Sequence, residues 1–169
     1  MLKVDLRQLE RQRRVRIDEV VPPDDALWNG LDVRVEKPLD VRLEAQFAGH
    51  DLLVRGEVEG EFVLPCRRCL TDVAVNLQEE VAFLYRRGLS ATEAEEQEIF
   101  PLPERGDEVD LRDALREHVA LSVPRFAVCQ DACRGLCPHC GTNLNHTQCD
   151  CSPVEVDDRW AALRKLRTD

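Results

Sequence analysis

Alternation of apolar and polar residues dominates the first half of the chain, from Val4 to Tyr85. The clearest run carries an apolar side chain at every second position from Leu39 to Phe47. Because successive side chains of a strand point to opposite faces of a sheet, this alternation predicts half-buried β-strands. Similar runs precede and follow it, with apolar positions at Val15, Ile17, Leu31, Val33, Val35, Val73, Val75, Leu77, Val81 and Phe83.

The tripeptide Gly49-His50-Asp51 separates this run from the next one, which covers residues 52–64. A glycine in a short connection between two strands predicts a β-hairpin. Gly56 and Gly60 within the second run predict β-bulges. The whole pattern predicts a β-rich antiparallel sheet, or a partly open barrel, over residues 1–87.

Helical spacing begins at residue 110. Asp110 is a good N-cap, and Leu111, Leu115 and Val119 share one face of a helix. Proline cannot continue a helix interior, so we expect this helix to end before Pro124 and to pack on the β-rich body.

A second, short helix is expected from residue 157 to residue 165. Acids stand at its start and Arg164 and Lys165 near its end, as the helix dipole favours, and Trp160 is expected to dock it on the body. One or two helices beside an antiparallel sheet indicate an α+β fold.

Residues 88–109 are acidic and contain two prolines, which favours a solvated connection over a packed element. The expected organisation is therefore a β-rich body (1–87), an acidic linker (88–109), a helix (110–124) and a metal-binding tail (125–169). A chain of 169 residues fits one such domain with a small appendage and disfavours a multidomain enzyme.

Composition excludes several classes of protein. The chain has eight cysteines but only eight aromatic residues, too few for a sheet that stacks several bases. No run approaches the roughly 18 apolar residues of a membrane span, and the first residues lack a signal-peptide core. We therefore expect a cytoplasmic protein, whose cysteines are reduced and bind metal or act in redox chemistry.

The cysteine spacing is the most informative feature of the chain. Leu136-Cys137-Pro138-His139-Cys140-Gly141 has the sequence of a zinc knuckle, in which both sulfurs face one metal ion. Zinc takes four ligands in a tetrahedron, so two knuckles usually face each other. Cys149 and Cys151 are near enough to supply the second pair. The expected first zinc site is therefore Cys137, Cys140, Cys149 and Cys151.

The other four cysteines leave two interpretations open. Cys66 and Cys69 follow a predicted strand and could join Cys129 and Cys133 in a second zinc site, or they could be ordinary thiols. Redox chemistry by the Cys66–Cys69 pair is disfavoured because the following residues have the pattern of a strand, whereas a redox pair needs a helix N-terminus. His139 and His146 could each replace a cysteine as zinc ligand, but they are expected to be surface residues, because the chain already has more cysteines than one zinc site needs.

A zinc ion held by four thiolates has no open position for water, so it stabilises the fold and does not hydrolyse substrates. The chain also contains no nucleotide-binding loop, no zinc-protease motif and no serine-hydrolase elbow. We therefore expect no enzymatic activity and no small-molecule substrate.

Several of these pieces occur together in a known order. They are Pro65-Cys66-Arg67-Arg68-Cys69-Leu70, a helix ending at Pro124, the segment from Cys133 to Asn145, Cys149-Asp150-Cys151, and Asp157-Asp158-Arg159-Trp160. In this combination the chain resembles the YceD family, which is named for large ribosomal RNA subunit accumulation. The resemblance implies a role in ribosome biogenesis without a known catalytic activity.

The first functional hypothesis is therefore a ribosome biogenesis factor that binds pre-ribosomal large-subunit RNA, a ribosomal protein, or both. The arginines that flank the cysteines or lie near the chain ends would contact phosphates: Arg11, Arg13, Arg14, Arg16, Arg67, Arg68, Arg134 and Arg164, with Lys165. The alternatives are a thiol redox or metal-handling protein using Cys66 and Cys69, and an adaptor whose acidic segment, residues 93–98, binds basic proteins.

Overall fold

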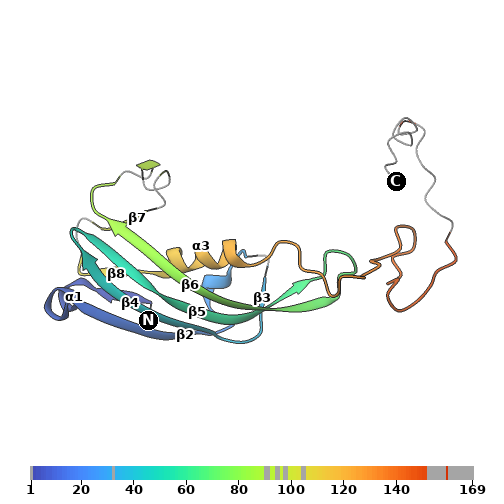
Figure 1. The fold of residues 1–169 in the computed structure, drawn as a ribbon, viewed down its shortest axis with the longest axis horizontal. Coiled ribbons are helices and arrows are strands. Elements are labelled where there is room, and N and C mark those ends of the chain that lie inside the picture. The colour runs from blue at the N-terminus through green and yellow to red at the C-terminus, as the bar shows by residue number, and fades with distance from the viewer. Residues whose placement is uncertain are drawn as a thin grey trace.

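The computed structural model describes residues 2–31, 33–89, 92–93, 96, 99–103, 106–151 and 159. Its main element is a curved sheet with the strand order β2-β4-β5-β6-β7, to which β3 is added beside β5 (Figure 1). The strands are β2 (Arg14–Val21), β3 (Arg34–Val35), β4 (Leu39–Ala48), β5 (Asp51–Pro65), β6 (Asp72–Arg86) and β7 (Phe100–Pro101).

The predicted hairpin is confirmed. Strands β4 and β5 are joined by a two-residue turn, Gly49-His50, because Ala48 pairs directly with Asp51. Gly49 has φ of 68°, a left-handed conformation that glycine adopts without steric penalty. The apolar residues at alternate positions of β4, from Leu39 to Ala45, are buried as the pattern predicts.

Two predictions about the sheet are wrong in detail. Pairing continues without a bulge past both Gly56 and Gly60, whose small size instead lets neighbouring residues of β4 approach closely. Among the described strands the sheet is also mixed, because the short β7 pairs parallel to β6, and it does not close into a barrel, since its edge strands β2 and β7 are not paired with each other.

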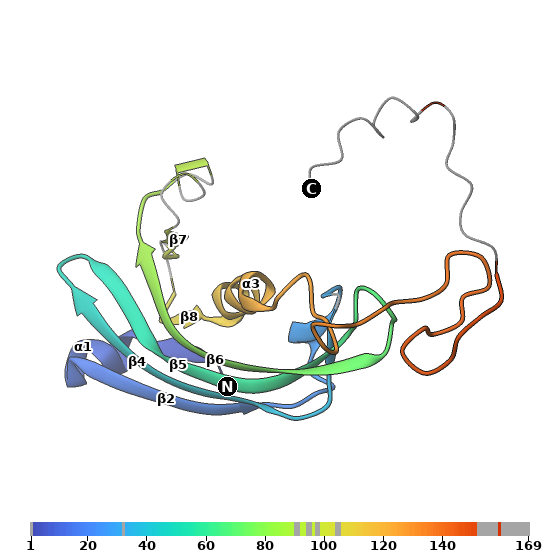
Figure 2. The same cartoon turned by 45° about the vertical axis from the view of Figure 1, so that its right-hand side comes forward.

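Helix α3 (Arg112–Ser122) lies along the concave side of the sheet (Figures 1 and 2). The predicted face is confirmed, since Leu111, Leu115 and Val119 are completely buried. The N-cap lies one residue later than predicted, at Leu111, which has no side-chain cap hydrogen bond, although the Asp110 carboxylate accepts a hydrogen bond from the backbone amide of Arg112. No described helix is long and apolar enough to cross a membrane.

The remaining described elements close the core beside α3. A second, small sheet pairs β1 (Lys3–Asp5) with β8 (Glu108–Asp110), and the short helix α1 (Leu6–Gln12) follows β1 directly. The 3₁₀ helix η1 (Ala26–Trp28) is held against α3 by Arg112, which pairs with Asp25, and by Arg116, which donates to two backbone carbonyls.

The sequence pattern missed α1, whose residues had been included in the alternating region. It also assigned β7 and β8 to the acidic connection. The expected terminal helix at residues 157–165, with Trp160, Arg164 and Lys165, lies outside the described residues except for residue 159. Of the acidic segment 93–98, only residues 93 and 96 are described.

Candidate metal centres

The eight cysteines gather into two groups of four, the same grouping that the spacing suggested. The first group is Cys66, Cys69, Cys129 and Cys133, and the second is Cys137, Cys140, Cys149 and Cys151. Within each group the sulfur atoms lie within 4.8 Å of one another. Four sulfurs at this separation can surround one ion, because tetrahedral zinc holds each sulfur at about 2.3 Å.

The first group joins two distant parts of the chain. Cys66 and Cys69 lie in the loop between β5 and β6, while Cys129 and Cys133 follow α3. The Cys69 and Cys129 sulfurs are 3.5 Å apart and those of Cys66 and Cys133 are 3.9 Å apart. A metal ion here would hold the segment after α3 against the loop between β5 and β6.

The loop at Cys66 is built as a metal-binding knuckle. The amide of Leu70 donates to the carbonyl of Cys66 at 2.9 Å, and the amide of Cys66 donates to the carbonyl of Thr71 at 2.8 Å. These bonds fold the backbone around the sulfur, and the amides of Arg68 and Cys129 each lie 3.4 Å from it. Amides directed at a sulfur stabilise its thiolate form.

The loop at Cys137 has the same two backbone hydrogen bonds. The amide of Gly141 donates to the carbonyl of Cys137 at 2.9 Å, and the amide of Cys137 donates to the carbonyl of Thr142 at 2.8 Å. In both loops a threonine hydroxyl lies beside the second sulfur, at 3.3 Å for Thr71 and 3.2 Å for Thr142. The two cysteine pairs are therefore two copies of one structural unit.

The copies differ at the residue after the second cysteine. Gly141 has φ of 72° and Leu70 has φ of 61°, so both occupy the left-handed region. This conformation costs a residue with a Cβ roughly 1–2 kcal/mol, and glycine much less. The structure nevertheless holds Leu70 there, because the bond to the Cys66 carbonyl requires it.

Asn145, which lies between the two cysteine pairs of the second group, contacts the first group. The side-chain amide of Asn145 lies 3.3 Å from the Cys133 sulfur, while its carbonyl oxygen accepts from the amide of Arg134. Sequence reasoning assigned no role to Asn145, Thr71 or Thr142. The repeated threonine two residues after Cys69 and Cys140 was the available signal.

The electrostatics of each group divide its cysteines into two kinds. Burial opposes ionisation of Cys66, but hydrogen bonds from the amides of Arg68, Cys129 and Cys69 outweigh it and lower its pKa to about 6. Thr142 likewise lowers the pKa of Cys140 to about 6. The pKa of Cys129 is raised by its hydrogen bond to Cys69, and that of Cys151 by its bond to Cys140. Without a cation, each group therefore cannot hold four thiolates near neutral pH.

Metal loading is consequently expected to release protons. Cys129 and Cys151 keep theirs at pH 7, whereas zinc binds thiolates, so each ion should displace at least one proton. Affinity should rise with pH, because fewer protons then compete. Below about pH 6, protonation of Cys66 and Cys140 should add to the competition and release the ions.

Titration of the metal-free, reduced chain with zinc, followed by calorimetry at pH 7 in two buffers of different ionisation enthalpy, measures this release. Heats that are the same in both buffers would contradict the assignment of these thiols.

Redox chemistry by Cys66 and Cys69 finds little support in the geometry. A reactive CxxC pair has its first cysteine at a helix N-terminus, where the dipole stabilises the thiolate. Here Asp72 begins strand β6 only three residues after Cys69. Both sulfurs are also buried and surrounded by the other cysteines of the group.

The arginines proposed for phosphate contacts are divided between two regions. Arg67, Arg68 and Arg134 lie around the first cysteine group. The others within the described residues, Arg11, Arg13, Arg14 and Arg16, lie on α1, on β2 or between them. The structure thus brings the predicted basic residues together only partly.

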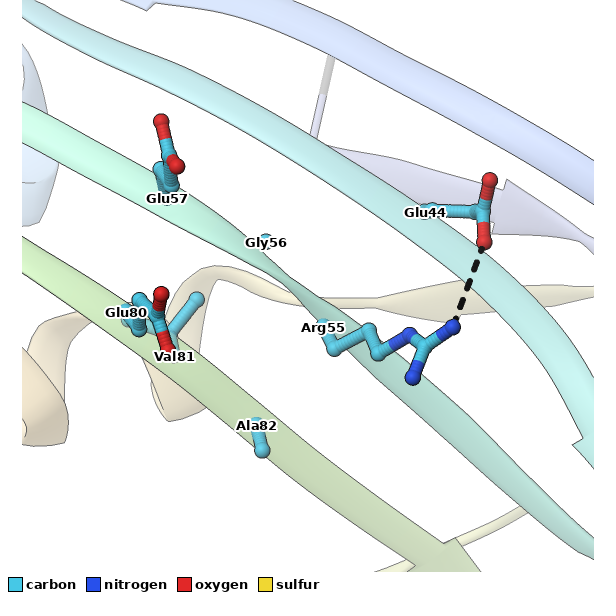
Figure 3. Close-up of a pocket in the computed structure, with 7 residues that line it drawn as sticks. All are labelled: Glu44, Arg55, Gly56, Glu57, Glu80, Val81 and Ala82. Carbon is cyan, nitrogen blue, oxygen red and sulfur yellow. Dashed lines mark ion pairs between the residues drawn. The ribbon is translucent and has the colours of Figure 1, made fainter.

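The two regions differ in their surroundings. Arg14 pairs with Glu44 on the outer face of the sheet, next to a hollow of about 530 Å³ over β4, β5 and β6 (Figure 3). Glu44, Glu57 and Glu80 line this hollow, against a single cation, Arg55, whose guanidinium lies 4.0 Å from Glu44. Glu57 and Glu80 face each other across the strands. This outer face would repel a phosphate backbone.

Comparison with known proteins gives one family. Residues 54–167 match the family model described as large ribosomal RNA subunit accumulation protein YceD. This range contains all eight cysteines and α3. No solved structure matches the chain.

Individual relatives agree with that match. An uncharacterised protein of Mycobacterium tuberculosis is 32% identical over 130 residues, 76% of this chain and 61% of the relative. The chain therefore spans about three fifths of that relative's length. The uncharacterised protein YlbN of Bacillus subtilis is 24% identical over 95% of this chain and 92% of its own. An Arabidopsis thaliana protein is 38% identical over 65 residues, 38% of this chain and 20% of the relative, and its name is large ribosomal RNA subunit accumulation protein YCED homolog 1, chloroplastic.

Proposed function

The chain belongs to the YceD family, and we propose from this that it is a non-enzymatic factor supporting accumulation of the large-subunit ribosomal RNA. The observation that carries the proposal is the family match over residues 54–167, because it includes both cysteine groups and α3, the helix between the two halves of the first group. The family name supplies the biological role, and the geometry supports a binding role over a catalytic one.

Two zinc ions would act as structural parts of this factor. Each group offers four sulfur ligands, which fill the coordination of zinc and leave no place for a substrate. The ions would fix the segment after α3, residues 125–151, relative to the curved sheet. The arginines that lie around the first cysteine group, Arg67, Arg68 and Arg134, would then be held in place before RNA binds, which reduces the entropy lost on binding.

The proposed partner is pre-ribosomal large-subunit RNA, with a ribosomal protein as the alternative. The arginines around the first cysteine group support RNA, since guanidinium groups bind phosphates in a bidentate manner. Each phosphate contact releases counterions, so the affinity should fall steeply with salt concentration. Salt-independent association with purified large-subunit RNA would instead indicate a protein partner.

Depletion of the protein in its host is expected to lower large-subunit ribosomal RNA relative to small-subunit RNA. Crosslinking in cells followed by sequencing of the attached RNA should concentrate reads on large-subunit precursors. A variant carrying Cys66→Ser should fail to restore the RNA ratio, whereas Val20→Ala, on the outer face of the sheet, should restore it. An unchanged ratio on depletion, with reads spread over unrelated transcripts, would refute the proposal.

A further inference from the structure

Large exposed apolar side chains gather near the first cysteine group. Among the described residues five such side chains are exposed, and four of them lie on the segments that meet there: Leu70, Leu121, Phe126 and Val128. Phe126 is the most exposed of them, at 82%. A concentration of apolar surface in one region marks a site of interaction more often than scattered single residues do.

The backbone on both sides of Phe126 is held in place. The carbonyl of Arg125 accepts a hydrogen bond from the side chain of Arg67 at 2.8 Å, and the carbonyl of Ala127 accepts one from the amide of Arg67 at 2.9 Å. Ala127 is buried while the ring of Phe126 points into solvent. The ring is therefore presented by a fixed backbone, which reduces the entropy lost when it binds a partner.

Phe126 borders a groove of about 460 Å³ between the end of α3 and strand β5. Its floor and walls are apolar, with Leu64 and Val123 among the lining residues. Its two charged residues are Arg67 and Arg125, and no acid lines it. Arg125 forms no ion pair with any residue that the structure describes, so its charge is available to an outside anion. Arg68, between Cys66 and Cys69, and Arg134, directly after Cys133, add positive charge around the first cysteine group.

We propose that this groove binds an unpaired base of single-stranded RNA, with the base stacked on Phe126 and the adjoining phosphate held by Arg125. The inference rests on the proposed function and gives it a site. An aromatic ring beside an arginine fits both parts of a nucleotide, because every base has a flat face and every linkage carries a negative charge. The volume is within the range of pockets that hold small ligands, so a base can enter it.

The charge of the groove favours RNA over an apolar protein segment. A purely apolar partner would bury the charge of Arg125 without supplying an anion to pair with it, which is unfavourable when a charge loses water. A polyanion neutralises this charge without needing an acid at one particular position. The outer face of the sheet, with its opposed glutamates, offers RNA no comparable place.

Binding of the zinc-loaded full chain to a fluorescent oligouridine of about 12 nucleotides tests the site. Phe126→Leu keeps an apolar side chain but removes the ring, and it should weaken binding on the order of tenfold, whereas Phe126→Tyr should bind nearly as well as the wild type. Arg125→Gln should weaken binding and reduce the salt dependence by about one phosphate contact. The matched charge control is Arg87→Gln, an exposed arginine after β6, which should change little.

The outcomes separate this site from the wider function. Equal affinity of Phe126→Leu and wild type for the RNA would overturn the site, while leaving an RNA-binding factor that uses another surface. If Phe126→Leu stopped binding a ribosomal protein but still bound RNA as the wild type does, the groove would be a protein-binding site instead. No binding of RNA by the wild type would refute the site and leave only the protein-partner form of the proposed function.

Discussion

Replacing Cys66 by serine is expected to remove one metal ion and to release the segment after α3 from the β5–β6 loop. Serine does not substitute for a thiolate, and four-sulfur sites contribute folding energy directly, with apparent zinc-binding free energies on the order of 10 kcal/mol. The first cysteine group joins the β5–β6 loop to residues 129–133, so its loss should free residues 125–151. Limited proteolysis should then cut this segment while the sheet stays resistant.

Cys137→Ser is the matched control for this experiment, because Cys137 occupies the same position in its knuckle as Cys66 does in the other. It should remove the other ion and open only residues 137–151, leaving residues 125–133 protected. Identical cleavage patterns for the two variants, or full protection in both, would contradict the assignment of separate structural roles.

Replacing Gly56 by alanine is expected to destabilise the sheet by about 3 kcal/mol or more. A Cβ at this position would lie 2.0 Å from the backbone oxygen of Arg42 and 2.8 Å from the Cα of Leu43. Because these are backbone atoms of the paired strand, a change of rotamer cannot relieve the clash, and β4 has to move. Urea unfolding of the purified chain measures the loss of free energy.

Gly60→Ala supplies the comparison on the same strand. There the nearest atom, at 2.6 Å, is the end of the Leu39 side chain, which can rotate away. We expect a loss of about 1 kcal/mol, within the usual range for overpacking. A Gly56→Ala protein as stable as Gly60→Ala would show that β4 and β5 are not packed as closely as described.

Local patterns in the sequence account for much of the sheet. Alternation predicts β2, β4, β5 and β6, since burial on one face leaves a period of two, and the glycine at position 49 predicts the hairpin turn. Helix α1 was missed because its seven residues carry only Leu6 and Leu9 on the buried side. The cap at Asp5, whose carboxylate accepts from the amide of Gln8, was the signal that could have shown it.

The candidate sites depend on contacts that local patterns record only in part. The knuckle at Cys137 is evident from its glycine, but the one at Cys66 has Leu70 in the left-handed position, which the residue type does not predict. The grouping of Cys66 and Cys69 with Cys129 and Cys133 was one of two interpretations that the spacing left open, because 59 residues separate the two pairs and only the tertiary fold brings them together. The groove at Phe126 was not predictable, because the chain between α3 and Cys129 has no periodic pattern, and only tertiary contacts with Arg67 place its backbone.

Native mass spectrometry of the full chain, purified without chelator and with its thiols kept reduced, counts the metal ions that the eight cysteines hold. We expect a mass increase of two zinc ions per chain, each bound by four cysteine thiolates, and loss of both ions on acid unfolding. A folded protein whose native mass equals that of the bare polypeptide, with eight thiols free to react, would contradict it.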